Sequence, residues 1–148
     1  MANEIQFHYT ADQSGIYATI RNASGQVYNR NSDTFENWAD ANLANYKIML
    51  TENGDGGGCY VSDFDPDSDG ITAGTYHVQV FDSSDVFLGS GEIYWSGTGE
   101  ITAEKILANK AIQTKSTGAV DYYDDDGETV LISHTPADSS TEVTRTPS

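Results

Sequence analysis

The stretch Gly15-Ile-Tyr-Ala-Thr-Ile-Arg21 decides the fold, because its apolar residues alternate with larger polar and aromatic ones. Ile16, Ala18 and Ile20 fall on one face of an extended strand, and the residues between them fall on the other. A second stretch, Gly74-Thr-Tyr-His-Val-Gln-Val-Phe81, repeats the same period. Such alternation is typical of antiparallel strands with one buried face, so we expect a mostly β protein.

Turn-forming residues divide the first part of the chain into short segments. Asn22-Ala-Ser-Gly25 predicts a hairpin turn, and glycines crowd residues 53–58. This spacing favours an immunoglobulin-like antiparallel β-sandwich over residues 1–97. The segment 31–45 suits a short helical turn packed on that sandwich. The expected core contains Ile16, Ile20, Ile48, Leu50, Val78, Val80 and Trp95.

After Gly99 the apolar period changes. Residues 100–113 are rich in helix formers and begin near Thr102, a good N-cap, so we expect a helix there. Strands are expected at 119–123, 129–133 and 142–145, with a turn at Asp124-Asp-Asp-Gly127 and a loop containing Pro136. Residues 98–148 are therefore expected to form a second part, a short helix plus a β-hairpin.

The strongly negative net charge of the chain limits the kinds of molecule that it is expected to bind. The chain carries 23 acidic and 7 basic residues, a formal net charge of −16, which repels nucleic acids and anionic membranes. We expect neither as a partner. The N-terminus lacks the basic and apolar regions of a signal peptide, and no apolar run is long enough to span a membrane. Cys59 is the single cysteine, which suits assembly in a reducing cytoplasm.

Catalytic motifs are not apparent. His8, His77 and His134 stand in no recognisable nucleophile or zinc motif. Cys59 follows three glycines with no basic residue beside it to lower its pKa. We expect no enzymatic activity and no cofactor.

One segment has the composition of a cation site. Asp63, Asp65, Asp67 and Asp69 alternate before Gly70, as in the first half of a calcium loop. The second half is missing, because Tyr76 stands where the bidentate glutamate would belong when Asp65 is the first ligand. We favour the simpler interpretation of a solvated acidic loop.

Two groups of side chains are candidates for protein contacts. Phe81, Phe87 and Tyr94 are expected to point outward from their strands, where they form an interface patch or are covered by the C-terminal part. That part has few apolar residues and needs a partner surface to offset the entropy of ordering. Its candidate contacts are Ile106, Leu107, Ile112, Val130 and Ile132.

Two longer segments suggest a family. Residues 15–28, together with Ile71-Thr-Ala-Gly-Thr-Tyr-His-Val-Gln-Val80, resemble the immunoglobulin-like or prealbumin-like modules of bacterial surface and phage proteins. Residues 110–148, with Thr117-Gly-Ala-Val-Asp-Tyr-Tyr-Asp-Asp-Asp-Gly-Glu-Thr-Val-Leu131, are similar to the C-terminal ends of small structural proteins of tailed bacteriophages. No catalytic residue is carried over by either resemblance.

The resemblance implies a virion component: a capsid decoration or cement protein, or a neck, tail or baseplate accessory. Its expected partners are capsid or tail subunits and further copies of itself in a homo-oligomer, assembled in the host cytoplasm. The alternative is a bacterial cell-surface or secreted module that recognises a glycan or a protein through exposed aromatic residues. That alternative requires a secretion signal.

Overall fold

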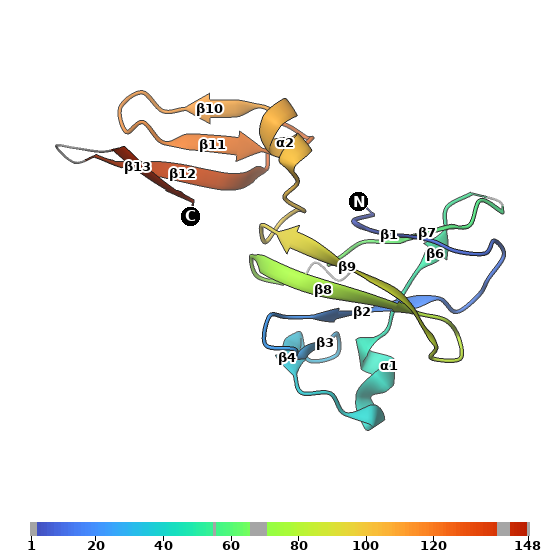
Figure 1. The fold of residues 1–148 in the computed structure, drawn as a ribbon. Helices are drawn as coiled ribbons and strands as arrows, with labels where there is room; N and C mark the ends of the chain where they lie inside the picture. The colour runs from blue at the N-terminus through green and yellow to red at the C-terminus, as the bar shows by residue number, and fades with distance from the viewer. Residues whose placement is uncertain (1–2, 55, 66–70, 139–142, 148) are drawn as a thin grey trace. The chain divides into compact units, whose positions relative to one another are not determined.

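The computed structural model describes residues 3–54, 56–65, 71–138 and 143–147 (Figure 1). It confirms a mostly β fold with antiparallel sheets. The chain forms two compact units, Met1–Tyr94 and Trp95–Ser148, called unit 1 and unit 2 below. The described residues contain no helix long and apolar enough to cross a membrane.

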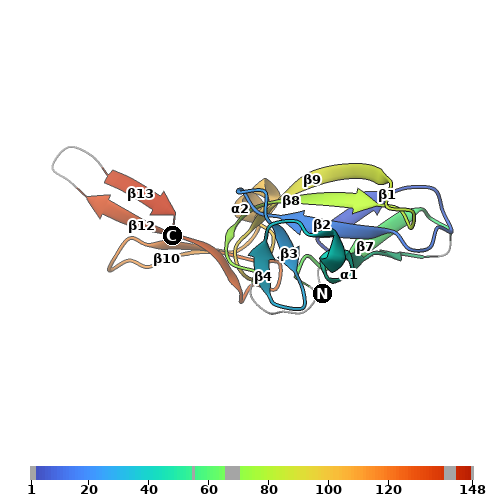
Figure 2. The same ribbon diagram turned by 90° about the horizontal axis from the view of Figure 1, so that it is seen from below.

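Unit 1 contains a three-stranded and a six-stranded antiparallel sheet (Figure 2). The first has the order β1-β7-β6, and the second has the order β4-β3-β2-β8-β9 with β5 paired to β2. The strands are β1 (Ile5–His8), β2 (Tyr17–Arg21), β3 (Val27–Asn29), β4 (Thr34–Glu36), β5 (Ile48–Met49), β6 (Thr51–Glu52), β7 (Cys59–Ser62), β8 (Gly74–Phe81) and β9 (Phe87–Trp95).

The six-stranded sheet buries its alternating apolar residues. In the β2–β8 ladder Ala18 lies opposite Val80 and Ile20 opposite Val78, and all four side chains are buried. A side chain at Gly89 in β9 would collide with Phe7 of β1, which shows how closely the sheets approach there. All seven residues of the predicted core are buried, and the most exposed of them, Leu50, is 7% exposed. The sandwich-like arrangement over this region is therefore confirmed.

The segment 31–45 differs from the expected single helical turn. It begins with β4, and then a 3-10 turn, η1 (Asp40–Asn42), leads into the short helix α1 (Leu43–Tyr46). Glu36 explains the arrangement, because one of its carboxylate oxygens accepts hydrogen bonds from Tyr46 (2.6 Å), Asn29 (3.0 Å) and Asn42 (2.9 Å). These bonds lower the pKa of Glu36. The carboxylate thus joins β4, β3 and α1 into one layer.

Unit 2 is a four-stranded antiparallel sheet with the order β10-β11-β12-β13 and one short helix (Figure 1). Its elements are α2 (Ala103–Ala108), β10 (Ala111–Gln113), β11 (Val120–Tyr123), β12 (Val130–Asp138) and β13 (Val143–Pro147). The sheet is larger than the hairpin that the sequence predicts. The expected turn at residues 124–127 is confirmed, since Gly127 N–H donates to the Asp124 carbonyl at 2.9 Å and Gly127 has a φ of 68°.

Two predictions in unit 2 are wrong. The helix covers residues 103–108 rather than 100–113, although Thr102 does cap it by accepting a bond from Lys105 N–H. Asn109 has an extended backbone conformation. The Lys110 carbonyl then accepts a bond from Tyr123 of β11, and Thr114 N–H donates to Ala119, just before β11, so cross-strand pairing overrides helix propensity. Pro136 lies within β12, opposite Arg145, and not in a loop. Because β11 begins at Val120, which lies opposite His134, Pro136 has no partner in β11, and its missing N–H removes no bond to that strand.

Candidate functional site

The eight predicted interface residues divide between the two units. Phe81, Phe87 and Tyr94 belong to unit 1, and the other five belong to unit 2. The most exposed of the eight are Leu107 at 85%, Phe87 and Tyr94 at 53% each, Ile112 at 41% and Val130 at 40%. Ile106, Ile132 and Phe81 are half-buried.

The unit 1 residues do not form one patch. Phe81 stacks on Tyr17, with 5.3 Å between ring centroids, and meets the edge of Phe87 at 5.8 Å. Tyr94 lies near the other end of β9, where its hydroxyl contacts Glu92, and Glu92 in turn pairs with His77 at 3.3 Å. The structure therefore brings two of the three predicted aromatic residues together and leaves the third apart.

A polar cluster that the sequence does not reveal adjoins Phe81. Lys47 Nζ lies 4.1 Å from the centroid of the Tyr17 ring and 2.7 Å from Asp85 Oδ1, and the Tyr17 hydroxyl donates to the same oxygen at 2.8 Å. Burial, followed by the bond to Asp85, raises the pKa of Tyr17. The bonds from Lys47 and Tyr17 lower the pKa of Asp85. These contacts connect Asp85, in the β8–β9 turn, to Tyr17 of β2 and to Lys47.

In unit 2, the two large apolar residues that the sheet exposes, Ile112 and Val130, share one face of it. The ladder register puts Ile112 opposite Asp121, and Asp121 opposite Ser133. A register shift between Tyr122 and Tyr123 then places Val130 opposite Tyr123. Since residues opposite each other across strands point to the same side, Ile112, Tyr123 and Val130 lie on one face. Lys110 covers part of it, with Nζ 4.4 Å from the centroid of the Tyr123 ring.

The strand β10 is exposed at all three of its residues, and β11 is its one bonded neighbour among the strands that the structure describes. Tyr123 N–H donates to the Lys110 carbonyl at 3.0 Å, and Thr114 N–H donates to the Ala119 carbonyl at 2.8 Å. In an antiparallel ladder alternate residues bond to the same neighbour, so residues 110, 112 and 114 face β11. The backbone groups of Ala111 and Gln113 therefore point outward. We call this outward side of residues 111–113 the β10 edge.

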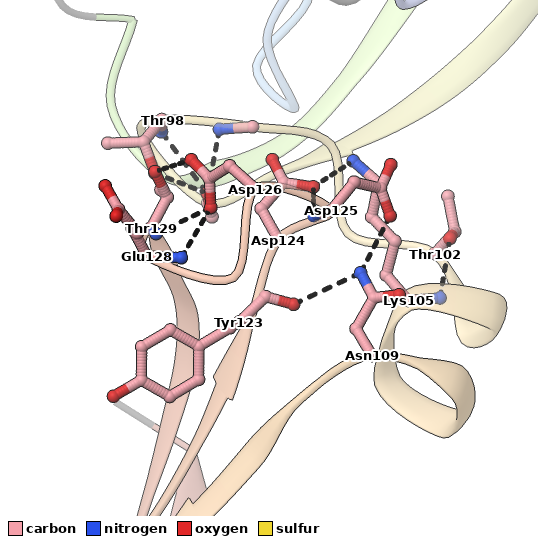
Figure 3. A network of polar contacts seen from close by, with 12 residues as sticks. Thr98, Thr102, Lys105, Asn109, Tyr123, Asp124, Asp125, Asp126, Glu128 and Thr129 are labelled. Carbon is pink, nitrogen blue, oxygen red and sulfur yellow. Dashed lines mark hydrogen bonds and ion pairs between the residues drawn. The ribbon is translucent and has the colours of Figure 1, made fainter.

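The turn between β11 and β12 holds three aspartates, which a network of polar contacts keeps in place (Figure 3). Asp124 pairs with Lys105 at 2.8 Å, and Asp125 accepts from Asn109 at 2.8 Å, so each ties the turn to the region of α2. Asp126 accepts bonds from the Thr129 hydroxyl at 2.6 Å and from the backbone N–H groups of Thr129 and Glu128 at 2.8 Å each. These three bonds, in that order, lower the pKa of Asp126 to about 2.

Each aspartate of this turn has different partners, so we interpret the network as one that stabilises the turn. Gly99 is part of it, because a side chain there would lie 2.7 Å from Asp124 Oδ2 and 3.2 Å from Leu131. Among the described residues, no three His, Cys, Asp or Glu side chains are grouped so that they could hold a metal ion.

The predicted calcium candidates are only partly described. Asp63 accepts a bond from Asn3 N–H at 3.1 Å, and Asp65 accepts one from Ile71 N–H at 3.3 Å. The Asp63 carboxylate therefore connects the start of the segment to Asn3, and the Asp65 carboxylate connects it to Ile71 at its other end. Asp67 and Asp69 lie outside the described residues.

The three histidines occupy different strands: His8 in β1, His77 in β8 and His134 in β12. His134 contacts the Tyr122 ring edge at 5.5 Å between centroids. Cys59, half-buried at the start of β7, lies directly opposite His8 in the β1–β7 ladder. The two residues are far apart in the chain, so only strand pairing reveals that a histidine neighbours this thiol.

Comparison of the chain with protein-family models, curated proteins and solved structures finds no match.

Proposed function

We propose that this chain is a non-enzymatic structural component of a tailed-bacteriophage virion, a capsid decoration or cement protein or a neck, tail or baseplate accessory. It acts through protein–protein contacts, and unit 2 makes them. The observation that carries the proposal is the exposure of large apolar side chains in unit 2. A unit of this size places Leu107, Ile112 and Val130 in solvent at 85%, 41% and 40% exposure.

Exposure of this kind favours assembly for a physical reason. Large aliphatic side chains in water cost free energy that burial in an interface recovers, at about 25 cal/mol for each Å² of apolar surface. The β10 edge adds backbone donors and acceptors on which a partner strand can pair. The kind of particle in which such contacts are made is part of this proposal and is taken from the resemblance that the sequence of residues 110–148 suggests.

The partners follow from the same proposal: capsid or tail subunits, and further copies of the chain, during assembly in the host cytoplasm. The net charge of −16 keeps unassembled chains soluble and disfavours contacts with nucleic acids. Neither a cofactor nor a metal enters the proposal.

A second candidate function rests on unit 1. Phe87 and Tyr94 are each 53% exposed, and Trp38 is 39% exposed. Exposed aromatic rings are surfaces on which a glycan or protein ligand can stack, as in a bacterial cell-surface recognition module. This candidate predicts glycan binding that Phe87→Ala and Tyr94→Ala abolish, whereas the virion proposal predicts incorporation into particles.

The test of the virion proposal is incorporation into phage particles produced in the host. The full chain is expected to copurify with intact particles at a constant copy number, measured by quantitative mass spectrometry. Deleting residues 98–148 is expected to leave a folded sandwich that no longer incorporates. Particles that lack the full chain, or that incorporate the truncated chain normally, would contradict the proposal.

A pair of point variants sharpens this test. Leu107→Lys places a charge on the most exposed apolar residue of α2 and is expected to reduce incorporation. Val86→Lys is the matched control, because Val86 is also exposed, at 56%, but lies in unit 1. Equal incorporation of both variants would show that unit 2 does not make the contact.

A further inference from the structure

We infer that the β10 edge pairs with the β10 edge of a second copy of this chain, antiparallel and about a two-fold axis at Ile112. This names the partner of the assembly surface proposed above and rests on that proposal in taking unit 2 as the part that makes contacts. Joining two four-stranded sheets in this way produces one eight-stranded sheet in which β10 is no longer an edge.

The first step of the argument is the register of the exposed backbone. Ala111 and Gln113 present their N–H and carbonyl groups outward, and Ile112 lies between them. A two-fold axis at Ile112 sets each Ala111 opposite Gln113 of the second copy. Both members of that pair have outward backbone groups, so they form the closely bonded pairs of an antiparallel ladder. No register slip or backbone change is needed.

The second step is the side chain on the axis. The two Ile112 residues form a non-hydrogen-bonded pair, in which side chains approach most closely. Ile112 is 41% exposed in the single chain, so the pairing buries apolar surface that otherwise faces water. The faces that carry Tyr123 and Val130 become continuous across the axis.

The third step is charge. An antiparallel pairing about Ile112 brings the C-terminal end of each β10 next to the N-terminal end of the other. The exposed Lys115 follows the C-terminal end, and Asn109, which donates to Asp125 of the acidic turn, precedes the N-terminal end, so opposite charges are brought to the same side. A parallel pairing would instead bring Lys115 beside Lys115 and turn beside turn. The net charge of −16 opposes association in general, so this local complementarity selects the antiparallel arrangement.

Residues 111–113 contain neither a charged residue nor a proline, two of the devices by which proteins keep an edge strand from pairing. Lys110, the charged residue directly before the strand, makes its contacts on the side of β11 and the acidic turn. Its Nζ donates to the Gly127 carbonyl at 2.8 Å and covers the Tyr123 ring.

The experiment measures self-association of the purified full chain by sedimentation equilibrium. A concentration-dependent species of twice the 16.0 kDa chain mass is expected. Ile112→Lys places like charges together on the axis and is expected to weaken the dimer by about tenfold or more. Val130→Lys makes the same change on the same face at a similar exposure, but away from the edge, and is expected to leave the dimer intact.

Two further variants separate edge pairing from loss of fold. Gln113→Pro removes an outward N–H without removing a backbone bond to β11 and is expected to weaken the dimer. Gln113→Ala keeps that N–H and is expected to leave the dimer intact. In a Cys59→Ser background, Ile112→Cys is expected to form an intermolecular disulfide on mild oxidation, because the Cα separation of a non-hydrogen-bonded pair suits one. Val130→Cys is expected not to crosslink.

A monomeric full chain, a dimer that Ile112→Lys leaves unchanged, or equal crosslinking at positions 112 and 130 would overturn the inference. These outcomes are independent of particle incorporation. A chain that incorporates into particles but stays monomeric refutes the pairing alone, and a dimer absent from particles refutes the virion proposal alone.

Discussion

At the scale of the residue, Thr19 stands out in unit 1 because its buried hydroxyl lacks a hydrogen bond within the described part of the chain. Its side chain is fully buried between Tyr17 and Arg21 on β2, and its hydroxyl has no hydrogen-bond partner among the described residues. A buried hydroxyl without a partner costs free energy, because it has lost its bonds to water.

Thr19→Val replaces that hydroxyl with a methyl group of nearly the same size. We expect it to raise the free energy of unfolding by about 1 kcal/mol, measured by urea denaturation. Thr75→Val, at an exposed position of β8, is the control for the general effect of valine in a strand. A destabilised Thr19→Val would show that the hydroxyl is satisfied in solution.

At the scale of the element, Asp126 holds the turn that joins β11 to β12. Its pKa of about 2 lies below the ordinary value of 3.8, so the ionised form stabilises the folded turn. Because the folded pKa is lowered, this contribution is complete above the ordinary value and is lost as the pH falls from about 4 toward about 2.

Asp126→Asn is therefore expected to lower the thermal unfolding midpoint of the chain near neutral pH and to have little effect near pH 2. Asp12→Asn, at an exposed position of unit 1, controls for the loss of one negative charge. Thr129→Val should shift the carboxyl titration of Asp126, followed by NMR, back toward the ordinary pKa. A wild-type titration midpoint already at the ordinary value would refute the account.

At the scale of the whole molecule, charge repulsion is the dominant long-range force. The first 97 residues hold three basic and fourteen acidic side chains, and residues 98–148 hold four and nine. Both parts are thus acidic, and repulsion within each favours expanded states.

Sodium chloride is expected to raise the thermal unfolding midpoint, because the screening length falls from about 30 Å at 0.01 M salt to about 8 Å at 0.15 M. Potassium chloride should act equally if screening is the cause. A chelator should leave the midpoint unchanged, since the sequence after Asp63, Asp65, Asp67 and Asp69 lacks the second half of a calcium loop. A lowered midpoint with chelator would instead identify a bound divalent cation.

The sequence alone was sufficient for the central strands of the sandwich, β2 and β8, and for the sandwich core. Alternation such as that of Ile16, Ala18 and Ile20 is a local property, and a strand with this pattern can bury its apolar side chains on only one face. The turn at residues 124–127 was equally accessible, because Asp and Gly supply the backbone conformations that a tight connection needs. The N-cap role of Thr102 follows from the same kind of local chemistry.

Only the tertiary structure decided the features that depend on distant partners. Residues 109–114 have helix-forming composition, yet pairing with β11 makes them a strand and creates the β10 edge. Cys59 and His8 lie opposite each other because of the β1–β7 register. Glu36 connects its strand to neighbouring elements because Tyr46 and Asn29, which lie on other elements, donate hydrogen bonds to it. A local pattern specifies which face of a segment is apolar, but hydrogen-bond partners far along the chain determine what that face and its backbone meet.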